Sequence, residues 1–253
     1  MIINRLNVPF VNFQASPIGK QKESLELPFT GLSSDIITFR GKREDKNDKQ
    51  SQLIKEPISL YVAKTAEDVS KSLSSLKNEE RKDSLLMTGY NDTIPLIFFS
   101  EKGRKTIVKA IIESTPDAET LKQMLTHQES DGYNALMAAN DKAMAEILIK
   151  AAPDDTTLSR MLTAEHKKHK FNSLIFKLIS NDRIYYEEDD YDTEAINAHI
   201  SALIDAAPDA ETLKQMLTQK DSNGNNALIY ALKNDNEEAM QILIDHLIDW
   251  TGK

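Results

Sequence analysis

Residues 116–126 read PDAETLKQMLT, and the same eleven residues return without a change at 208–218. A weaker copy starts at Pro153, which lies 37 residues after Pro116 and 55 residues before Pro208, so it carries 18 additional residues. Self-similarity at a regular spacing is typical of repeat proteins, in which one small unit cannot bury its own apolar face and stacks on its neighbours. The sequence therefore predicts a solenoid whose function depends on a surface rather than on a pocket.

Each copy opens with a Pro-Asp pair and a short helix. Leu121, Met124 and Leu125 fall on one face of this helix because their spacing matches the helical period. A turn follows at 129–132 in the first copy and at 221–224 in the last, and both turns end in Gly. Glycine suits such a reversal because it adopts a positive φ without a steric penalty.

Two more helices complete each copy. Asn134 and Asn226 are suited to cap a second helix, since their side-chain oxygens accept hydrogen bonds from backbone N–H groups at a helix start. Third helices are expected over 143–152 and 238–248. A fainter version of the same order precedes Pro116, so several units stack. The predicted fold class is all-α.

The chain divides into segments of different composition. Residues 1–55 contain scattered Pro and Gly and a charged run without apolar periodicity, which predicts a flexible, largely unstructured leader. Residues 56–84 are expected to form an N-terminal helical cap. Residues 85–253 hold the repeats, with an acidic insertion at 181–194 that accounts for most of the additional residues in the middle copy.

Composition excludes several classes of function. Residues 1–55 hold nine Lys or Arg against six Asp or Glu, and the remainder holds 22 against 34, so the acidic body argues against nucleic-acid binding. No cysteine is present, which excludes disulfides and thiolate chemistry. No apolar run approaches the roughly 20 residues of a membrane helix. A cleaved secretory signal is not expected either, which leaves a cytoplasmic protein or one exported by another route.

At the turns the chain resembles the ankyrin repeat family. The family hallmark is Asp-x-x-Gly-x-Thr-Pro-Leu-His-x-Ala, and the corresponding stretches here are ESDGYNALMAA at 129–139 and DSNGNNALIYA at 221–231. The Gly, the Leu and the final Ala match. Asn-Ala replaces Thr-Pro, and Met137 or Ile229 replaces the His, so the usual capping network is altered.

The resemblance covers roughly 85–248 and has two further departures. The unit is longer than the usual 33 residues, and the additional Pro-Asp helix is interpreted as a replacement for the β-hairpin finger of the family. The middle copy, KFNSL at 170–174, keeps Asn and Leu but has no Gly. A helical repeat of another type is the structural alternative.

The resemblance implies a protein-binding surface at the turn tips and on the exposed side of the first helix of each pair. Carried over by position, the partner-binding residues are Tyr133 and Ala138 in one copy and Asn225 and Tyr230 in another.

The acidic insertion is a second candidate binding element, because loops on a rigid scaffold often carry recognition. Its tyrosines would act as aromatic anchors and its carboxylates would attract a basic surface of another protein. The residues concerned are Tyr185, Tyr186, Asp189, Asp190 and Tyr191. The alternative is a solvated acidic loop. Its spacing lacks the ligand pattern of a calcium loop, so no metal site is expected.

Two histidines three residues apart, His166 and His169, suggest a zinc site at first sight. They lack the His-Glu-x-x-His order, and the lysines around them would repel a cation. A solvated basic turn is the expected structure.

The function expected from these observations is a non-catalytic scaffold for protein–protein interaction, with no cofactor. The alternative is an exported bacterial effector or host-interacting protein, in which residues 1–55 are the export address and the repeats bind a host target. An enzyme with an atypical site in the N-terminal part is the third class, but few groups there suit acid–base or nucleophilic work.

Overall fold

The computed structural model describes residues 59–179 and 192–251, with side chains as far as residue 247. The predicted leader and most of the acidic insertion lie outside the described residues. The regular elements within these ranges are all helical, which confirms the all-α repeat class. They are α1 Ala66–Ser74, α2 Asn78–Leu85, the 3₁₀ turn η1 Tyr90–Asp92, α3 Pro95–Glu101, α4 Lys105–Glu113, α5 Ala118–Thr126, α6 Ala135–Ala138, α7 Lys142–Ala151, α8 Asp155–Thr163, α9 Ser173–Ile179, α10 Thr193–Asp205, α11 Ala210–Thr218, α12 Ala227–Lys233 and α13 Glu237–Thr251.

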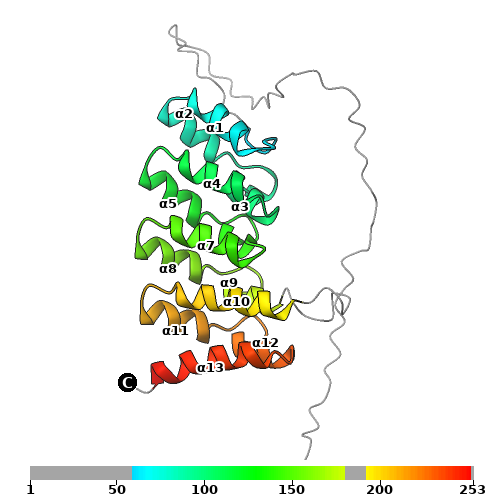
Figure 1. The fold of residues 1–253 in the computed structure, drawn as a ribbon. Coiled ribbons are helices and arrows are strands. Elements are labelled where there is room, and N and C mark those ends of the chain that lie inside the picture. The colour runs from blue at the N-terminus through cyan, green and yellow to red at the C-terminus, as the bar shows by residue number, and fades with distance from the viewer. Residues whose placement is uncertain (1–58, 180–191, 252–253) are drawn as a thin grey trace, which may run out of the picture. The chain divides into compact units, whose positions relative to one another are not determined.

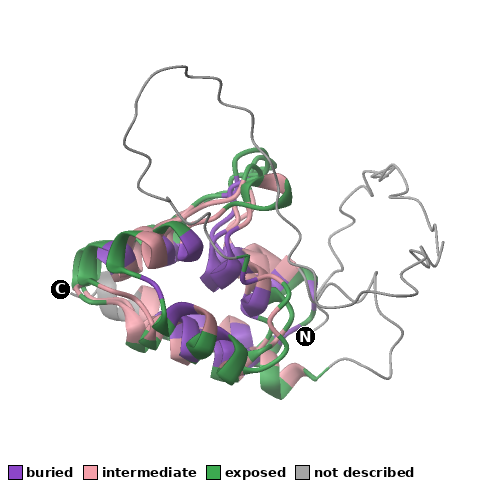
Figure 2. Cartoon of the chain, turned by 90° about the horizontal axis from the view of Figure 1, so that it is seen from above, coloured by how far each residue is buried: buried purple, intermediate pink, exposed green. Residues whose placement is uncertain are grey.

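The described helices stack in three columns (Figure 1). The inner column holds α3, α6, α9 and α12, and the middle column holds α1, α4, α7, α10 and α13, with each helix packed on the next. The outer column holds α5, α8 and α11, with α2 at its N-terminal end. Viewed along the stack, buried residues gather between the columns and exposed residues lie outside them (Figure 2). Each unit therefore contributes one helix to every column.

The outer helices begin at a shared signal. Asp117, Asp154 and Asp209 have extended backbone, and one carboxylate oxygen of each accepts the backbone N–H three residues later at 2.7 Å. This bond satisfies an N–H that a helix start leaves unpaired, and the negative charge favours the helix N-terminus. The Pro-Asp pairs of the sequence therefore determine where α5, α8 and α11 begin.

Methionine occupies the same core position in these helices. Met124, Met161 and Met216 are fully buried, and the leucine that follows each of them is buried as well. Burial of one such side chain stabilises the fold by about 1.5–3 kcal/mol relative to exposure. The apolar stripe read from the residue spacing is therefore the core of the stack.

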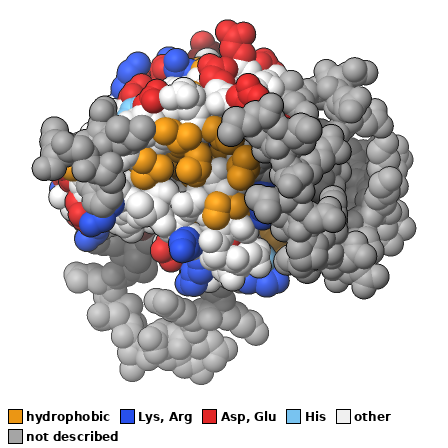
Figure 3. All heavy atoms as spheres, turned by 90° about the horizontal axis from the view of Figure 1, so that it is seen from below, with side chains coloured by type: hydrophobic (Ala, Val, Ile, Leu, Met, Phe, Trp, Pro, Cys, Tyr) orange, Lys and Arg blue, Asp and Glu red, His pale blue; other side chains and the backbone are white. Residues whose placement is uncertain are grey.

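The last unit ends the stack with apolar side chains that are partly open to solvent. Leu232 on α12 is 61% exposed and Ile244 on α13 is 36% exposed. Viewed from the α13 end, hydrophobic side chains gather on this face (Figure 3). In the described ranges, no helix is long and apolar enough to cross a membrane.

Candidate functional site

A closed turn precedes each inner helix of the described chain, and we call these turns the first to fourth fingers: residues 89–93, 129–133, 166–171 and 221–225. In each finger the backbone N–H of the first residue donates to the carbonyl of the last at 2.8–2.9 Å. The turns predicted at 129–132 and 221–224 are confirmed as the second and fourth fingers, and the described residues form no β-strand at these turns. The additional helix packs in a column of its own, so it leaves the place of the finger free.

Backbone hydrogen bonds join neighbouring fingers. The N–H groups of Ser130, Lys167 and Ser222 donate to the carbonyls of Asn91, Asp131 and His169, respectively, at 2.8–2.9 Å. Each bond links one unit to the next, so the fingers form a row at a fixed spacing. Rigid turns of this kind lose little conformational entropy when a partner binds, so the free-energy cost of binding is smaller.

Asparagine supplies the capping network that the altered motif had left open. The side-chain oxygen of Asn134 accepts the N–H of Met137 at 2.8 Å, and its amide nitrogen donates to the carbonyl of Met161 in the next unit at 2.8 Å. Asn172 repeats this arrangement, with its amide donating to Met216 at 3.0 Å. Asn thus caps its own inner helix and also ties that helix to the following outer helix. The shorter Thr side chain could form the cap but could not reach the next unit as well.

An aromatic cluster surrounds Tyr133 in the second finger. Its ring centroid lies 5.0 Å from His166 and 5.2 Å from Phe176, both edge-to-face, which is a favourable geometry for ring pairs. Phe171 stacks on His166 at 4.6 Å. Burial raises the pKa of the Tyr133 hydroxyl, and the carboxylates of its own finger raise it further, so the group is a neutral donor at pH 7. Tyr133 and Phe176 are half-buried, so part of each ring remains available to a partner.

His166 is part of this cluster rather than a metal ligand. The expectation of a solvated turn is wrong for this residue, which is only 6% exposed. Its Nδ1 accepts the backbone N–H of His169 at 3.0 Å, and burial lowers its pKa, with His169 and Lys168 adding to the effect. Among the described residues, no group of His, Cys, Asp or Glu is arranged to hold a metal ion.

The other predicted binding residues have different surroundings. Ala138 is half-buried at the end of α6. Tyr230 donates its hydroxyl to Asp221 at 2.6 Å, and the backbone N–H of Asn225 donates to the same carboxylate at 2.8 Å. Burial opposes ionisation of Asp221, but these bonds outweigh it and lower its pKa. In the fourth finger the predicted residues therefore also hold the turn together.

Five predicted residues of the acidic insertion lie outside the described residues and stay predictions: Tyr185, Tyr186, Asp189, Asp190 and Tyr191. The structure also identifies surface residues that were missed. Phe98 and Phe176 are half-buried and occupy the same place on α3 and α9 as Ala138 on α6 and Tyr230 on α12. Counting four residues on from the capping position would have found both.

A buried polar group lies between the inner and middle columns. Lys177 on α9 is 8% exposed and donates to the carbonyl of Ala139, and burial lowers its pKa to about 8. His199 on α10 is 3% exposed, and burial lowers its pKa to about 3, with Lys177 contributing. Burial opposes ionisation of Asp141, but the hydrogen bond from Lys105 and the N–H of Met144 outweigh it and lower its pKa. Lys177 and His199 serve the interior because both are buried, whereas the carboxylate of Asp141 is 43% exposed.

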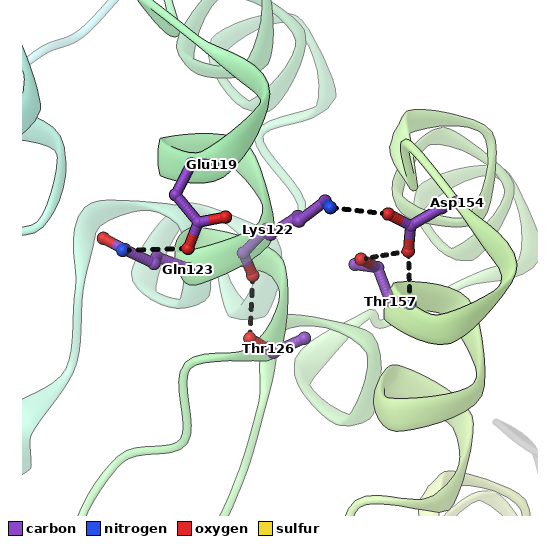
Figure 4. Close-up of polar contacts among 6 residues, drawn as sticks. All are labelled: Glu119, Lys122, Gln123, Thr126, Asp154 and Thr157. Atoms are coloured by element: carbon purple, nitrogen blue, oxygen red, sulfur yellow. Dashed lines mark hydrogen bonds and ion pairs between the residues drawn. The ribbon is translucent and has the colours of Figure 1, made fainter.

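The outer column carries polar links between units instead of aromatic rings (Figure 4). The ammonium of Lys122 on α5 lies 2.7 Å from the carboxylate of Asp154, which caps α8. Within α5, Gln123 donates to Glu119 at 3.2 Å. The Lys122–Asp154 pair joins α5 to α8, and the outer helices also pack on one another, so we assign this column a structural role.

Stacked finger turns, paired inner and middle helices and an additional outer helix define the chain as a helical repeat protein with an ankyrin-like arrangement. No protein-family model matches the chain, and no curated protein is significantly similar to it. Among solved structures, the chain is similar to the crystal structure of EF0377, an ankyrin repeat protein, at 17% identity and a TM-score of 0.36 over 72% of this chain and 98% of that one. The repeat architecture therefore rests on the geometry of the chain itself.

Proposed function

We propose that this chain is a non-catalytic scaffold that binds another protein through its fingers and inner helices. The observation that carries the proposal is the row of fingers, which backbone hydrogen bonds join from unit to unit. This row presents exposed tips, such as Tyr90, which is 95% exposed, and Asn223. Preorganised surfaces bind with a smaller loss of entropy than flexible ones.

The half-buried aromatic residues beside the row support the same conclusion. Tyr133, Phe98, Phe176 and Tyr230 have large, rigid side chains that are partly open to solvent. Residues of this type contribute most of the binding free energy in protein interfaces when a partner completes their burial. The partner-binding roles of Ala138 and Asn225 follow from their places on the same side of the stack.

Site-specific photo-crosslinking tests the proposal. A photoreactive phenylalanine derivative replaces Tyr90 or Asn223 at the fingers, and Ala118 or Ala210 on the outer helices provides matched controls, since all four positions are exposed. We expect the finger positions to crosslink to a defined protein in extracts of the source cells and the outer positions not to do so. Equal crosslinking from both sets, or none from the fingers, would contradict the proposal.

The alternative of an exported effector depends on residues 1–55, which lie outside the described residues, and it stays a prediction. The same holds for a basic partner surface recognised by the insertion. Deleting residues 1–55 and following both the location of the chain and the finger crosslinks would separate an export address from a binding element.

A further inference from the structure

The third finger carries a concentration of positive charge that the other fingers lack. Lys167, Lys168 and Lys170 are all exposed, and none of them forms an ion pair with a described residue. The only side-chain hydrogen bond found for these lysines in the described chain joins Lys167 to the backbone carbonyl of Glu129 at 3.5 Å. Lys220, just ahead of the fourth finger, is exposed as well. The lysine charges are therefore available to a partner.

Lys170 has a backbone conformation that disfavours lysine. Its φ is 60°, whereas the residues at the same place in the second and fourth fingers are Gly132 and Gly224, with φ of 96° and 80°. The first finger has Asp92 there, with φ of 59°. Asp tolerates this left-handed region better than lysine does, and glycine tolerates it best. A strained residue where glycine would fit suggests that the lysine side chain has a role other than folding.

The backbone of the third finger is held from both sides. Lys167 donates its N–H to the second finger, and the carbonyl of His169 accepts the N–H of Ser222 in the fourth finger at 2.8 Å. The side-chain amide of Gln219 donates to the carbonyl of Lys170 at 2.8 Å. The lysines therefore project from a fixed turn and not from a loop that must order on binding.

We infer that the third finger binds an acidic peptide segment of the partner protein, an inference that rests on the proposed function. The exposed lysines supply the charge, and the rings of His169 and Tyr133 beside them offer contact to an apolar side chain of the same segment. Glu165 and Asp131 are both exposed and lie where the third finger meets the second finger, so they limit the patch on that side, which suits a short segment. A nucleic acid fits less well, because the formal net charge of the chain is −9 and a duplex needs a longer basic surface.

The test measures binding of a short fluorescein-labelled peptide of Asp, Glu and Tyr to the full chain by fluorescence anisotropy. Replacing Lys167, Lys168 and Lys170 with Gln is expected to weaken binding by about tenfold or more, as removal of several complementary charges does. The matched control replaces Lys64, Lys71 and Lys109 with Gln, which changes the net charge equally on other exposed sites and is expected to leave binding within about twofold.

The single change Lys170→Gly separates binding from folding. We expect it to weaken peptide binding severalfold while the melting temperature stays the same or rises, because glycine relieves the strain at φ 60°. A purely structural lysine would give a lower melting temperature and unchanged binding.

Several results would overturn the inference. They are absence of peptide binding, equal losses in the two triple variants, a lower melting temperature for Lys170→Gly, or tighter binding of a short duplex RNA than of the peptide. If any of these occurs while Tyr90 and Asn223 still crosslink to a protein, only the acidic-segment inference fails. If those crosslinks are absent as well, the proposed function fails with it.

Discussion

Helices α5 and α11 belong to the two identical eleven-residue stretches, but α5 lies in an interior unit and α11 in the last one. Their bounds are equivalent, Ala118–Thr126 and Ala210–Thr218, and each begins with an Asp carboxylate that accepts a backbone N–H at 2.7 Å. The local structure is the same because capping and helical hydrogen bonds join residues within about one turn of each other.

The contacts with neighbours differ between the two helices. Lys122 on α5 pairs with Asp154 of the next unit at 2.7 Å, whereas Lys214 at the same place on α11 pairs with Glu211 of its own helix at 3.7 Å. Thr126 is half-buried, and Thr218 is exposed. The comparison teaches that sequence determines the helix, but the following unit determines which of its side chains link the stack.

Core truncation should affect the two units equally. Met124→Ala and Met216→Ala are each expected to lower the free energy of unfolding by about 2–5 kcal/mol, since both side chains are fully buried. Circular dichroism in urea measures the loss. If Met216→Ala lowers the free energy of unfolding by less than about half as much as Met124→Ala, the expectation is wrong, because burial would then not determine the loss of stability.

Replacing a finger glycine with alanine should lower the free energy of unfolding more in the second finger than in the fourth. A Cβ at Gly132 would lie 2.7 Å from the carbonyl oxygen of Glu165 and 2.7 Å from the nitrogen of Lys167, whereas a Cβ at Gly224 meets nothing within 4 Å. Gly224→Ala is expected to cost about 1–2 kcal/mol for the left-handed backbone alone. Gly132→Ala adds about 1–3 kcal/mol of overpacking. Equal costs in urea unfolding would show that the third finger can move away.

Replacing a capping asparagine should also cost more stability in the interior unit than in the last one, but the difference should be smaller than for the glycines. Asn134→Ala removes a helix cap, worth about 1 kcal/mol, and also leaves the buried carbonyl of Met161 without its side-chain donor, which adds about 1 kcal/mol. Asn226→Ala removes a cap only, since Asn226 accepts the N–H of Ile229 at 3.1 Å. Asn134→Ser keeps a capping oxygen but loses the donor to Met161, so it should cost about 1 kcal/mol, which is less than Asn134→Ala and similar to Asn226→Ala. Urea unfolding of the three variants tests this order.

Acid should destabilise the interior through His199. Its pKa is about 3 in the folded chain and about 6.5 in a free side chain, so between these values only the unfolded chain binds the proton. Stability therefore falls as the pH is lowered through this window, by about 1.4 kcal/mol per pH unit. His199→Leu should lose less stability than the parent between pH 6 and pH 5, by about this amount. His246→Leu in the last unit is the control, and equal slopes for all three proteins would contradict the assignment.

The repeat and its helices could be predicted from the sequence because their signals are local. The Pro-Asp starts, the spacing of Leu121, Met124 and Leu125, and the glycine of the second finger each act within a few residues. Asp117 of the Pro-Asp start caps α5, and the apolar spacing marks the buried face of that helix. Gly132 of the second finger has a positive φ. The binding role of the acidic insertion remains a prediction.

The candidate site could be predicted only in part, because its contacts join residues from different units. Tyr133 was found by position, but its ring partners His166 and Phe176 belong to the next unit. The missing glycine of the middle copy was noticed, but the sequence did not show that Lys170 takes its place at positive φ. The turns of the second and fourth fingers were predicted, but nothing local indicates that the additional helix forms a third column.

The amino-acid sequence by itself determined the copied unit, its helices and their capped starts, because hydrogen bonds within one turn of the chain depend on near neighbours alone. Only the tertiary structure decided that the fingers form a row, that Asn134 ties one unit to the next and that three exposed lysines share one fixed finger. Those features depend on the distance between stacked units, and side-chain packing over the whole stack determines that distance.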